Sequence, residues 1–145
     1  MGHPNIIETE AELEAIVRAA KTVAVVGMKD ERTPYLPSYE IPRAVESHGL
    51  RVIPVNPHIE KSLGKKAFSS LAAMGERVDI VDVFRRIDAI AQLADDVLAL
   101  PQAQRPKVVW LQSGIRHDAA AQRLAEAGIQ VVQDRCLGVY TSRYR

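Results

Sequence analysis

Short apolar runs alternate with helical patterns along almost the whole chain. The runs that are rich in β-branched residues predict strands at Thr22–Val26, Arg51–Val55, Val78–Phe84, Lys107–Leu111 and Ile129–Val132. Nearly every position in these runs is apolar, rather than every second one, which is typical of parallel strands covered on both faces. A further short edge strand is expected at Lys65–Ala67.

Apolar residues at helical spacing fill the segments between these strands. Helices are predicted from Glu10 to Ala20, from about Ser38–Ile41 to Gly49, for one or two turns between Phe68 and Met74, from Asp88 to just before Pro101, and from His117 or Asp118 to Gly128. Thr9 and Glu12 form a capping box for the first helix. Pro42 requires the second helix to begin close by, because proline fits only the first turn. The tail from Asp134 to Arg145 is expected to cover an edge of the sheet.

Strands that alternate with helices predict βαβ units and a parallel sheet. The chain has 145 residues, the usual size of one domain. The expected fold is therefore a single Rossmann-like α/β domain over residues 1–145. Its parallel sheet is expected to be doubly wound in the order 3-2-1-4-5-6, with helices on both faces.

Composition narrows the classes of function. Lys and Arg number 19 against 18 Asp and Glu, so the net charge of +1 does not favour a nucleic-acid-binding protein. No apolar run is long enough to cross a bilayer, and no membrane association is expected. The single cysteine, Cys136, excludes an internal disulfide, and a reducing cytoplasm is the expected compartment. No residues have the spacing of metal ligands, and neither a metal nor a catalytic residue is predicted.

In a doubly wound sheet, ligands bind beyond the carboxyl ends of the strands, where the strand order reverses. That point lies between the strands ending at Gly27 and Phe84. The basic residues that follow strand ends are Lys29, Arg32, Arg85, Arg86 and Arg116, with Lys61, Lys65 and Lys66 in the loop after the second strand. Basic side chains and backbone N–H groups at a helix start favour an anion site. The alternative interpretation is that these side chains are ordinary solvated charges.

A nicotinamide dinucleotide site is poorly supported by the same segments. The segment Gly27–Arg32 has one glycine instead of the G-x-G-x-x-G pattern, and the second strand ends at Val55-Asn56-Pro57 without an acid for the ribose hydroxyls. The G-x-x-x-x-G-K-[ST] loop of nucleoside triphosphatases does not occur either.

Five motifs follow one another along the chain: Val23–Gly27, Val52–Pro57, Asp79–Arg86, Trp110–Ile115 and Asp134–Cys136. In this order and spacing they resemble the CoA-binding protein family. Its members are small stand-alone proteins similar to the amino-terminal domain of the succinyl-CoA synthetase α subunit. The resemblance extends from about Ile6 to Tyr140. It implies a Rossmann-like, nucleotide-binding domain whose ligand is coenzyme A.

The resemblance also implies which residues hold the ligand. The loop after the first strand, with Gly27, Met28, Lys29, Asp30, Arg32, Thr33 and Pro34, would hold the nucleotide end. The basic residue after the second strand would be Lys61, Lys65 or Lys66, of which Lys61 is included in the predicted site. The adenine and pantetheine path would be lined by Val83, Phe84, Arg85 and Arg86, and the pantetheine arm by Gln112, Ser113, Gly114 and Ile115.

The chemistry of CoA suits these residue types. Lys and Arg match its pyrophosphate and 3′-phosphate. An apolar slot for adenine could be formed by Pro34, Pro57 and Phe84, with Asn56 beside them at the end of the second strand. Gln112 and Ser113 can exchange hydrogen bonds with the pantetheine amides.

Two acids depart from the glycine-rich loop of the synthetases. Because carboxylates near a pyrophosphate are unfavourable, Asp30 and Glu31 are expected to point outward or to pair with Arg32. No second synthetase domain with its phosphorylated histidine is found in the sequence. We therefore expect binding of CoA or an acyl-CoA rather than thioester synthesis by this chain alone.

Three alternatives stay open. One is an enzyme that uses Cys136, a thiol next to Arg135, although free cysteines are often simply buried apolar residues. Another is an NAD(P)-dependent oxidoreductase that uses the same pocket. The third is a regulatory or scaffold domain whose pocket has lost its function. The protein partner is unknown from the sequence.

Overall fold

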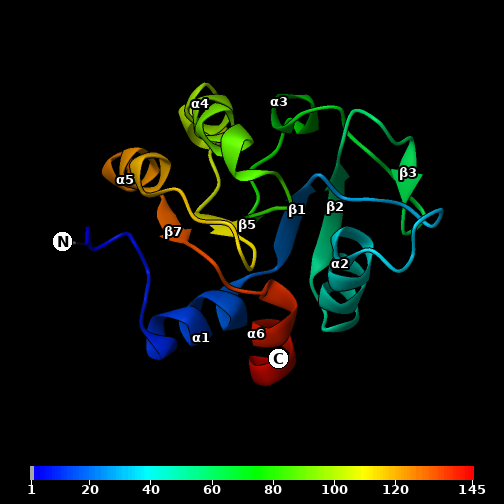
Figure 1. Ribbon diagram of the computed structural model, residues 1–145, viewed down its shortest axis with the longest axis horizontal. Coiled ribbons are helices and arrows are strands. Elements are labelled where there is room, and N and C mark those ends of the chain that lie inside the picture. Colours follow the sequence, from blue (N-terminus) through cyan, green and yellow to red (C-terminus); the bar gives the residue numbers. More distant parts are fainter. Residues whose placement is uncertain (1) are drawn as a thin grey trace.

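Five of the apolar runs form one parallel sheet (Figure 1). The structure, a computed structural model, describes residues 2–145. The strands of the sheet are β1 (Thr22–Val26), β2 (Arg51–Val55), β5 (Ile80–Val83), β6 (Val108–Leu111) and β7 (Gln130–Val132). They lie in the order β2-β1-β5-β6-β7, and every neighbouring pair is parallel. The predicted Rossmann-like fold, with helices on both faces, is confirmed.

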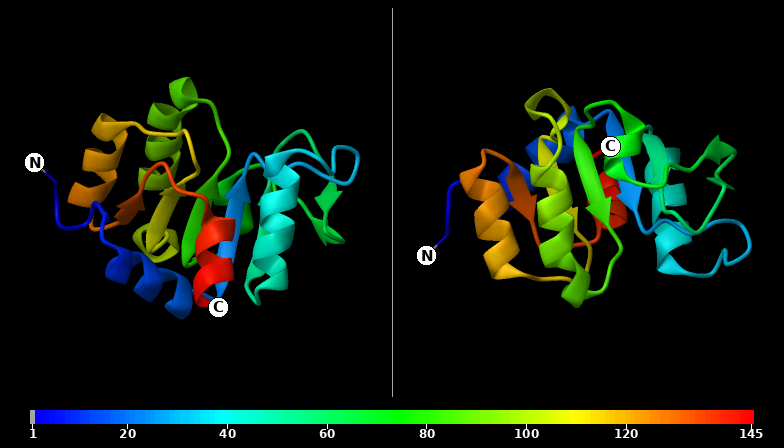
Figure 2. Two further views of the ribbon diagram at one scale, coloured as in Figure 1. Left: turned by 60° about the horizontal axis from the view of Figure 1, so that its bottom comes forward. Right: turned by 90° about the horizontal axis from the view of Figure 1, so that it is seen from above.

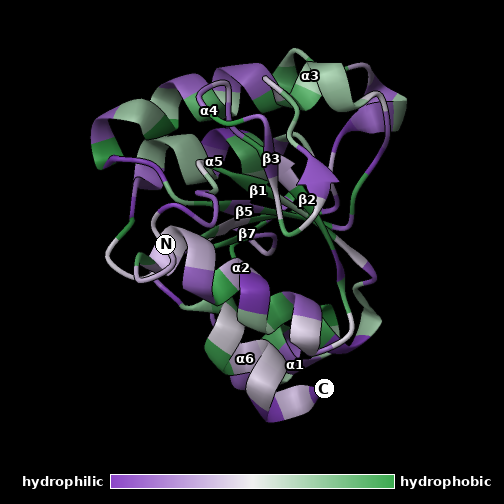
Figure 3. Cartoon of the chain, turned by 90° about the vertical axis from the view of Figure 1, so that its right-hand side faces the viewer, coloured by the Kyte–Doolittle hydropathy of each residue, from purple (hydrophilic) through white to green (hydrophobic). Residues whose placement is uncertain are grey.

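The helices cover the sheet in two layers, as Figure 2 shows from two further sides. The helices are α1 (Glu10–Ala19), α2 (Pro37–Ser47), α3 (Leu71–Met74), α4 (Ile90–Leu98), α5 (Asp118–Glu126) and α6 (Leu137–Tyr144), with 3₁₀ turns η1 (Ile87–Ala89) and η2 (Gln102–Gln104). α1, α2 and α6 lie on one face, and α3, α4 and α5 lie on the other. Both layers pack hydrophobic residues against the sheet, and its strands are coloured mostly as hydrophobic in Figure 3. None of the helices within residues 2–145 is long and apolar enough to cross a membrane.

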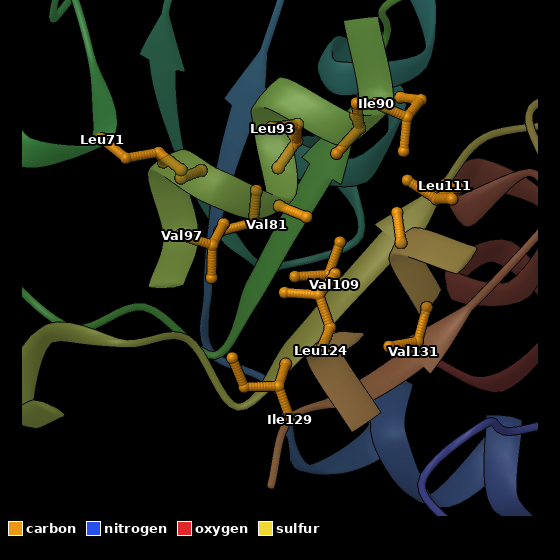
Figure 4. Packing of buried hydrophobic residues seen from close by; sticks show 14 of the residues in the cluster. Leu71, Val81, Ile90, Leu93, Val97, Val109, Leu111, Leu124, Ile129 and Val131 are labelled. Carbon is orange, nitrogen blue, oxygen red and sulfur yellow. The ribbon is translucent and has the colours of Figure 1, made fainter. Parts of the chain in front are cut away.

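Two buried clusters hold these layers to the sheet. Leu93, Val97 and Leu124 pack on Val81 and Val109 on the side of α4 and α5 (Figure 4). On the other side, the cluster under α1, α2 and α6 contains the fully buried Trp110. Burial of each large aliphatic side chain contributes about 1.5–3 kcal/mol, so both faces of the sheet stabilise the fold.

The predicted third strand of the sheet is replaced by a separate hairpin. β4 (Lys65–Lys66) pairs antiparallel with β3 (Lys61–Ser62), through a turn in which Leu63 and Gly64 have φ of 52° and 73°. Only Phe68 reaches the sheet, where its N–H donates to Pro54 O at 3.0 Å and it forms one parallel bridge with Val55. The order 3-2-1-4-5-6 therefore holds approximately, because its outermost strand is reduced to a single bridge.

Pro42 does not lie in the first turn of its helix, so that expectation is wrong. α2 begins at Pro37, and Pro42 is inside it. A proline at position 42 cannot donate to the carbonyl of Ser38 four residues earlier. The N–H of Lys29 donates to Ser38 O instead, at 3.0 Å. The helix thus tolerates Pro42 because the loop after β1 satisfies the carbonyl that this proline leaves free.

Two other expectations are also wrong. The helix predicted from Asp88 begins at Ile90, because Asp88 lies in η1 and does not cap α4. The tail does not cover a sheet edge, because α6 packs against α1 and α2 on a sheet face. Glu10 fixes α6 by accepting hydrogen bonds from Arg143 at 2.5 Å and the Tyr144 hydroxyl at 2.6 Å. The predicted start of the helix at His117 or Asp118 is confirmed: α5 begins at Asp118, and His117 caps it, since its Nδ1 accepts from Ala120 N at 3.0 Å.

Candidate functional site

A crevice of about 380 Å³ opens at the carboxyl ends of β1 and β2, beside the point where the strand order reverses. It lies on the side of the sheet that α3 and α4 cover. The residues around it are Val26, Gly27, Val55, Pro57, Ser69, Ser70, Leu71, Ala72, Arg85, Leu93, Asp96 and Ala99. The predicted site residues among them are Gly27, Pro57 and Arg85.

Gly27 lets the backbones of β1 and β5 approach closely at the floor of this crevice. Its φ is +85°, and an added Cβ would lie 2.2 Å from the carbonyl oxygen of Phe84. Only glycine fits there. The side chain of Arg85 lies directly above, with its Cδ 3.4 Å from that Cβ position. Arg85 is exposed and forms no ion pair within residues 2–145. The crevice thus combines bare backbone with a free guanidinium.

The loop after β1 is fastened by its own carbonyl groups. Met28 O accepts from the Asn56 side-chain amide at 2.8 Å, and Lys29 O accepts from the Ser62 hydroxyl at 2.8 Å. The side chain of Met28 is fully buried in the core, so only its backbone could meet a ligand. Lys29, Pro34 and the guanidinium of Arg32 are exposed, and Thr33 is half-buried.

Both acids of this loop are engaged by donors of the protein. Asp30 accepts from Arg32 Nε at 3.0 Å and from Arg32 N at 3.1 Å. This side-chain hydrogen bond lowers the pKa of Asp30. Glu31 accepts from Leu63 N at 2.9 Å and from the Tyr39 hydroxyl at 3.2 Å. The expected pairing with Arg32 therefore occurs at Asp30, while Glu31 turns to the hairpin.

Some of the predicted basic residues have exposed side chains without an ion pair, whereas others bind acids or carbonyl groups of the protein. Lys61 and Lys66 lie directly opposite each other on the hairpin and are exposed, next to the loop that carries Lys29. The ammonium group of Lys65 donates hydrogen bonds to Glu46 and to Val52 O, so it is not free. Arg86 extends into solvent and pairs with Asp88 at 3.4 Å.

Arg116 lies apart from this group. It pairs with Asp118 at 3.1 Å and borders a different cavity, together with Gly2 and Ile6. We call Lys29, Lys61, Lys66 and Arg85 the basic rim, because they are exposed, follow the ends of β1, β2 and β5 and form no ion pair within residues 2–145, whereas Arg32 pairs with Asp30.

The predicted residues at the end of β6 lie outside the crevice. Gln112 is buried and accepts from Leu137 N at 3.0 Å, so its side chain holds the start of α6. Gly114 N donates to Asp134 at 2.6 Å, and Ile115 O accepts from Asp134 N at 3.1 Å. Of this group, only Ser113 has an exposed side chain.

Three further predicted contacts have side chains that are covered by the protein. Val83 is fully buried in the core on the side of α4 and α5, and the half-buried Phe84 packs against the cluster on the α1, α2 and α6 side. Asn56 is also buried, with its amide on Met28 and its carbonyl oxygen accepting from His58 N at 2.9 Å. The roles that the resemblance assigns to Val83, Phe84 and Asn56 stay predictions. A ligand would contact these residues through their backbone or through the exposed edge of the Phe84 ring.

Sequence reasoning missed the far wall of the crevice. Ser69 and Ser70 line it from the start of α3, and Asp96 lines it from α4. The Ser70 hydroxyl caps α3 by accepting from Ala73 N at 3.1 Å. A serine pair just before a helical run is a recognisable N-cap signal, but nothing in the sequence places that helix end opposite Arg85.

Cys136 lies on the other side of the sheet from this crevice. It is half-buried at the start of α6 and lines an open groove of about 790 Å³ between α2 and α6. His48 lines the same groove, and its Nδ1 hydrogen-bonds with the Thr141 hydroxyl at 2.8 Å. Neither residue borders the crevice that contains Gly27 and Arg85.

The parallel sheet, with a crevice beside its switch point, defines the molecule as a Rossmann-like α/β domain. The chain belongs to the CoA binding domain family, whose model matches residues 21–142. The family resemblance expected from the five motifs is thus confirmed.

Individual relatives agree with this assignment. The chain is 37% identical over 131 residues to the uncharacterized protein YneT of Bacillus subtilis (strain 168), which covers 90% of this chain and 93% of YneT. The solved structure of cell-free ID.343 from Thermus thermophilus has a TM-score of 0.85 and 43% identity, over 95% of this chain and 100% of that one. A hypothetical protein from Pyrococcus horikoshii, at 24% identity, shares the fold with a TM-score of 0.84, over 99% of this chain and 96% of its own.

Proposed function

We propose that this protein binds coenzyme A or an acyl-CoA at the carboxyl ends of β1, β2 and β5, as a binding module that does not synthesise thioesters on its own. The observation that carries the proposal is the unpaired Arg85 above the bare backbone of Gly27, in a chain of the CoA binding domain family. We place the protein in the cytoplasm, where CoA and a free thiol coexist.

The phosphates of CoA account for the basic rim. Each charge-assisted hydrogen bond contributes about 1.5–3 kcal/mol, so a few of them suffice for a polyphosphate ligand. Arg85 would meet the phosphate nearest the crevice, while Lys29, Lys61 and Lys66 would surround the others. The exposed Pro57 would border the adenine, opposite Leu71 of α3.

The crevice itself favours binding over thiol chemistry. Cys136 lies on the opposite face, so a CoA molecule in the crevice would have to fold over the rim to bring its thiol there. The second strand ends in Val55-Asn56-Pro57, with no acid at its tip to take the ribose hydroxyls of a nicotinamide cofactor.

Isothermal titration calorimetry against CoA, acetyl-CoA, NAD and NADP tests this proposal. We expect saturable binding of CoA and acetyl-CoA with one site, weakened by added salt because the contacts are ionic. Tighter binding of NAD or NADP than of CoA would favour an oxidoreductase. The absence of any binding would favour a scaffold with a vestigial pocket. Native mass spectrometry of the purified protein would show a ligand that co-purifies.

A further inference from the structure

The hairpin β3–β4 contains two arrangements that are unfavourable on their own. Lys61 and Lys66 are directly opposite each other, so their ammonium groups project from the same face of the hairpin. Like charges at such a pair of positions repel each other. Leu63, in the turn, has a left-handed φ of 52°, a conformation that normally requires Gly or Asn. A strained backbone conformation such as that of Leu63 persists only where its surroundings hold it, often at ligand sites.

Glu31 is the group that holds this turn. Its carboxylate accepts from the N–H of Leu63, the strained residue itself, at 2.9 Å. The same oxygen accepts from the hydroxyl of Tyr39 on α2 at 3.2 Å. Burial, and then the charge of Glu31, raise the pKa of Tyr39, so its hydroxyl remains a donor at neutral pH. One side chain therefore joins the loop after β1, the hairpin and α2.

We propose that Glu31 is a positioning residue that fastens the β3–β4 hairpin to the loop after β1 and so fixes Lys61 and Lys66 for the phosphates of CoA, without touching CoA. This inference rests on the proposed function. The hydroxyl of Ser62, which donates to Lys29 O at 2.8 Å, supplies a second link at the same place. Glu31, a carboxylate that would be unfavourable beside a phosphate, thus supports phosphate binding indirectly.

The direction in which CoA affinity changes when Glu31 is replaced distinguishes a positioning role from a purely electrostatic one. Removal of a negative charge near a phosphate site would strengthen CoA binding if Glu31 acted only through its charge. The positioning role predicts the opposite. We expect Glu31→Ala to weaken CoA binding by about tenfold, or about 1.4 kcal/mol. Glu31→Gln, whose carbonyl oxygen can still accept from Leu63 N and Tyr39, should bind CoA at least as tightly as the wild type.

Glu60 provides the matched control. It is an exposed acid of the same rim, and its side chain makes no hydrogen bond within residues 2–145. Glu60→Ala removes the same charge but leaves the hydrogen bonds of Glu31 to Leu63 and Tyr39 intact, so CoA binding should stay equal or become tighter. CoA affinities are measured by calorimetry, and thermal unfolding confirms that each variant is folded.

A double-mutant cycle between Glu31→Ala and Lys61→Ala tests the mechanism even if Glu31→Ala loses stability. In the wild-type background, Lys61→Ala should weaken CoA binding several-fold. In the Glu31→Ala background, it should have little further effect, because the hairpin no longer holds Lys61 in place. Additive effects, or a Glu31→Ala variant that binds CoA as tightly as the wild type, would overturn the positioning role and leave the proposed function intact. A wild-type protein that does not bind CoA would instead overturn the proposed function.

Discussion

At the scale of single residues, Asp82 is the most unusual group in the core. It lies in β5 between Val25 and Trp110 of the neighbouring strands and is fully buried. Neither carboxylate oxygen forms a hydrogen bond of normal geometry with residues 2–145. Burial raises the pKa of Asp82 well above its ordinary value, and the Val83 N–H offsets this only in part. The acid therefore favours its neutral form in the folded protein.

This pKa shift predicts how the stability depends on pH. The folded protein holds the Asp82 proton more tightly than the unfolded chain, so the free energy of unfolding falls as pH rises from about 4 through the raised pKa. Asp82→Asn, which cannot ionise, should remove this loss. We expect the variant to gain stability relative to the wild type as pH rises, by about 1.4 kcal/mol for each pH unit between the ordinary and the raised pKa. Urea unfolding at pH 5 and pH 8 measures the difference.

Asp79 provides an internal comparison with the opposite sign. Burial pushes the pKa of Asp79 upward, but the N–H groups of Lys21 and Thr22, with Lys107, outweigh it and lower that pKa. Its contribution to stability is therefore present above the ordinary pKa and lost as pH falls through the lowered one. Asp79→Asn should cost about 1 kcal/mol at neutral pH and less in acid. If the two substitutions changed the free energy of unfolding with the same dependence on pH, this account of Asp82 would be contradicted.

Arg85 is the residue through which the crevice is expected to recognise phosphate. Arg85→Ala should weaken CoA binding by about tenfold, because one charge-assisted contact is lost, and should reduce its salt dependence. Arg77→Ala is the control, since Arg77 is an exposed arginine just before β5, at the amino-terminal edge of the sheet. Equal CoA affinities for the two variants in calorimetry would remove Arg85 from the site.

At the scale of elements, the junction of β1 and β5 depends on Gly27. Gly27→Ala would require a left-handed alanine and would place its Cβ against the carbonyl oxygen of Phe84. We expect a loss of about 3 kcal/mol in the free energy of unfolding, from the strain and the clash together. Gly128 has a similar φ of +87° but nothing within 4 Å of an added Cβ. Gly128→Ala should therefore lose only about 1 kcal/mol, and equal losses in urea unfolding would show that the close approach has no energetic role.

The elements also show where sequence patterns fail. Continuous apolar runs predicted all five strands of the sheet, because burial on both faces requires apolar residues at every position. The hairpin was missed because its turn contains Leu63 in place of the usual Gly, Asn or Asp, and because the hydrogen bond from Leu63 N goes to Glu31, far away in the sequence. Pro42 was misplaced for the same reason, since the donor that satisfies Ser38 O comes from Lys29 in another segment.

At the scale of the whole molecule, topology predicted the position of the crevice better than the residues that line it. The switch point follows from the strand order alone, and Gly27, Pro57 and Arg85 are found there. Met28, Asn56, Val83 and Gln112 have buried side chains, which the sequence does not reveal, because a motif does not show which face of a strand end is covered. The wall made by Ser70 and Asp96 depends on how α3 and α4 pack, which no local pattern contains.

The central claim is that CoA binds at the carboxyl-terminal rim of the sheet, between Arg85 and the hairpin lysines. A titration of the isotopically labelled protein with CoA, followed by amide chemical shifts, tests it most directly. The account predicts that the largest changes fall on residues 27–34, on Ser69 and Ser70, on Arg85 and on the hairpin. Residues at the opposite pole, such as Ala15 and Lys107, should change little. Changes confined to that pole, or to the groove between α2 and α6, would contradict the proposed site.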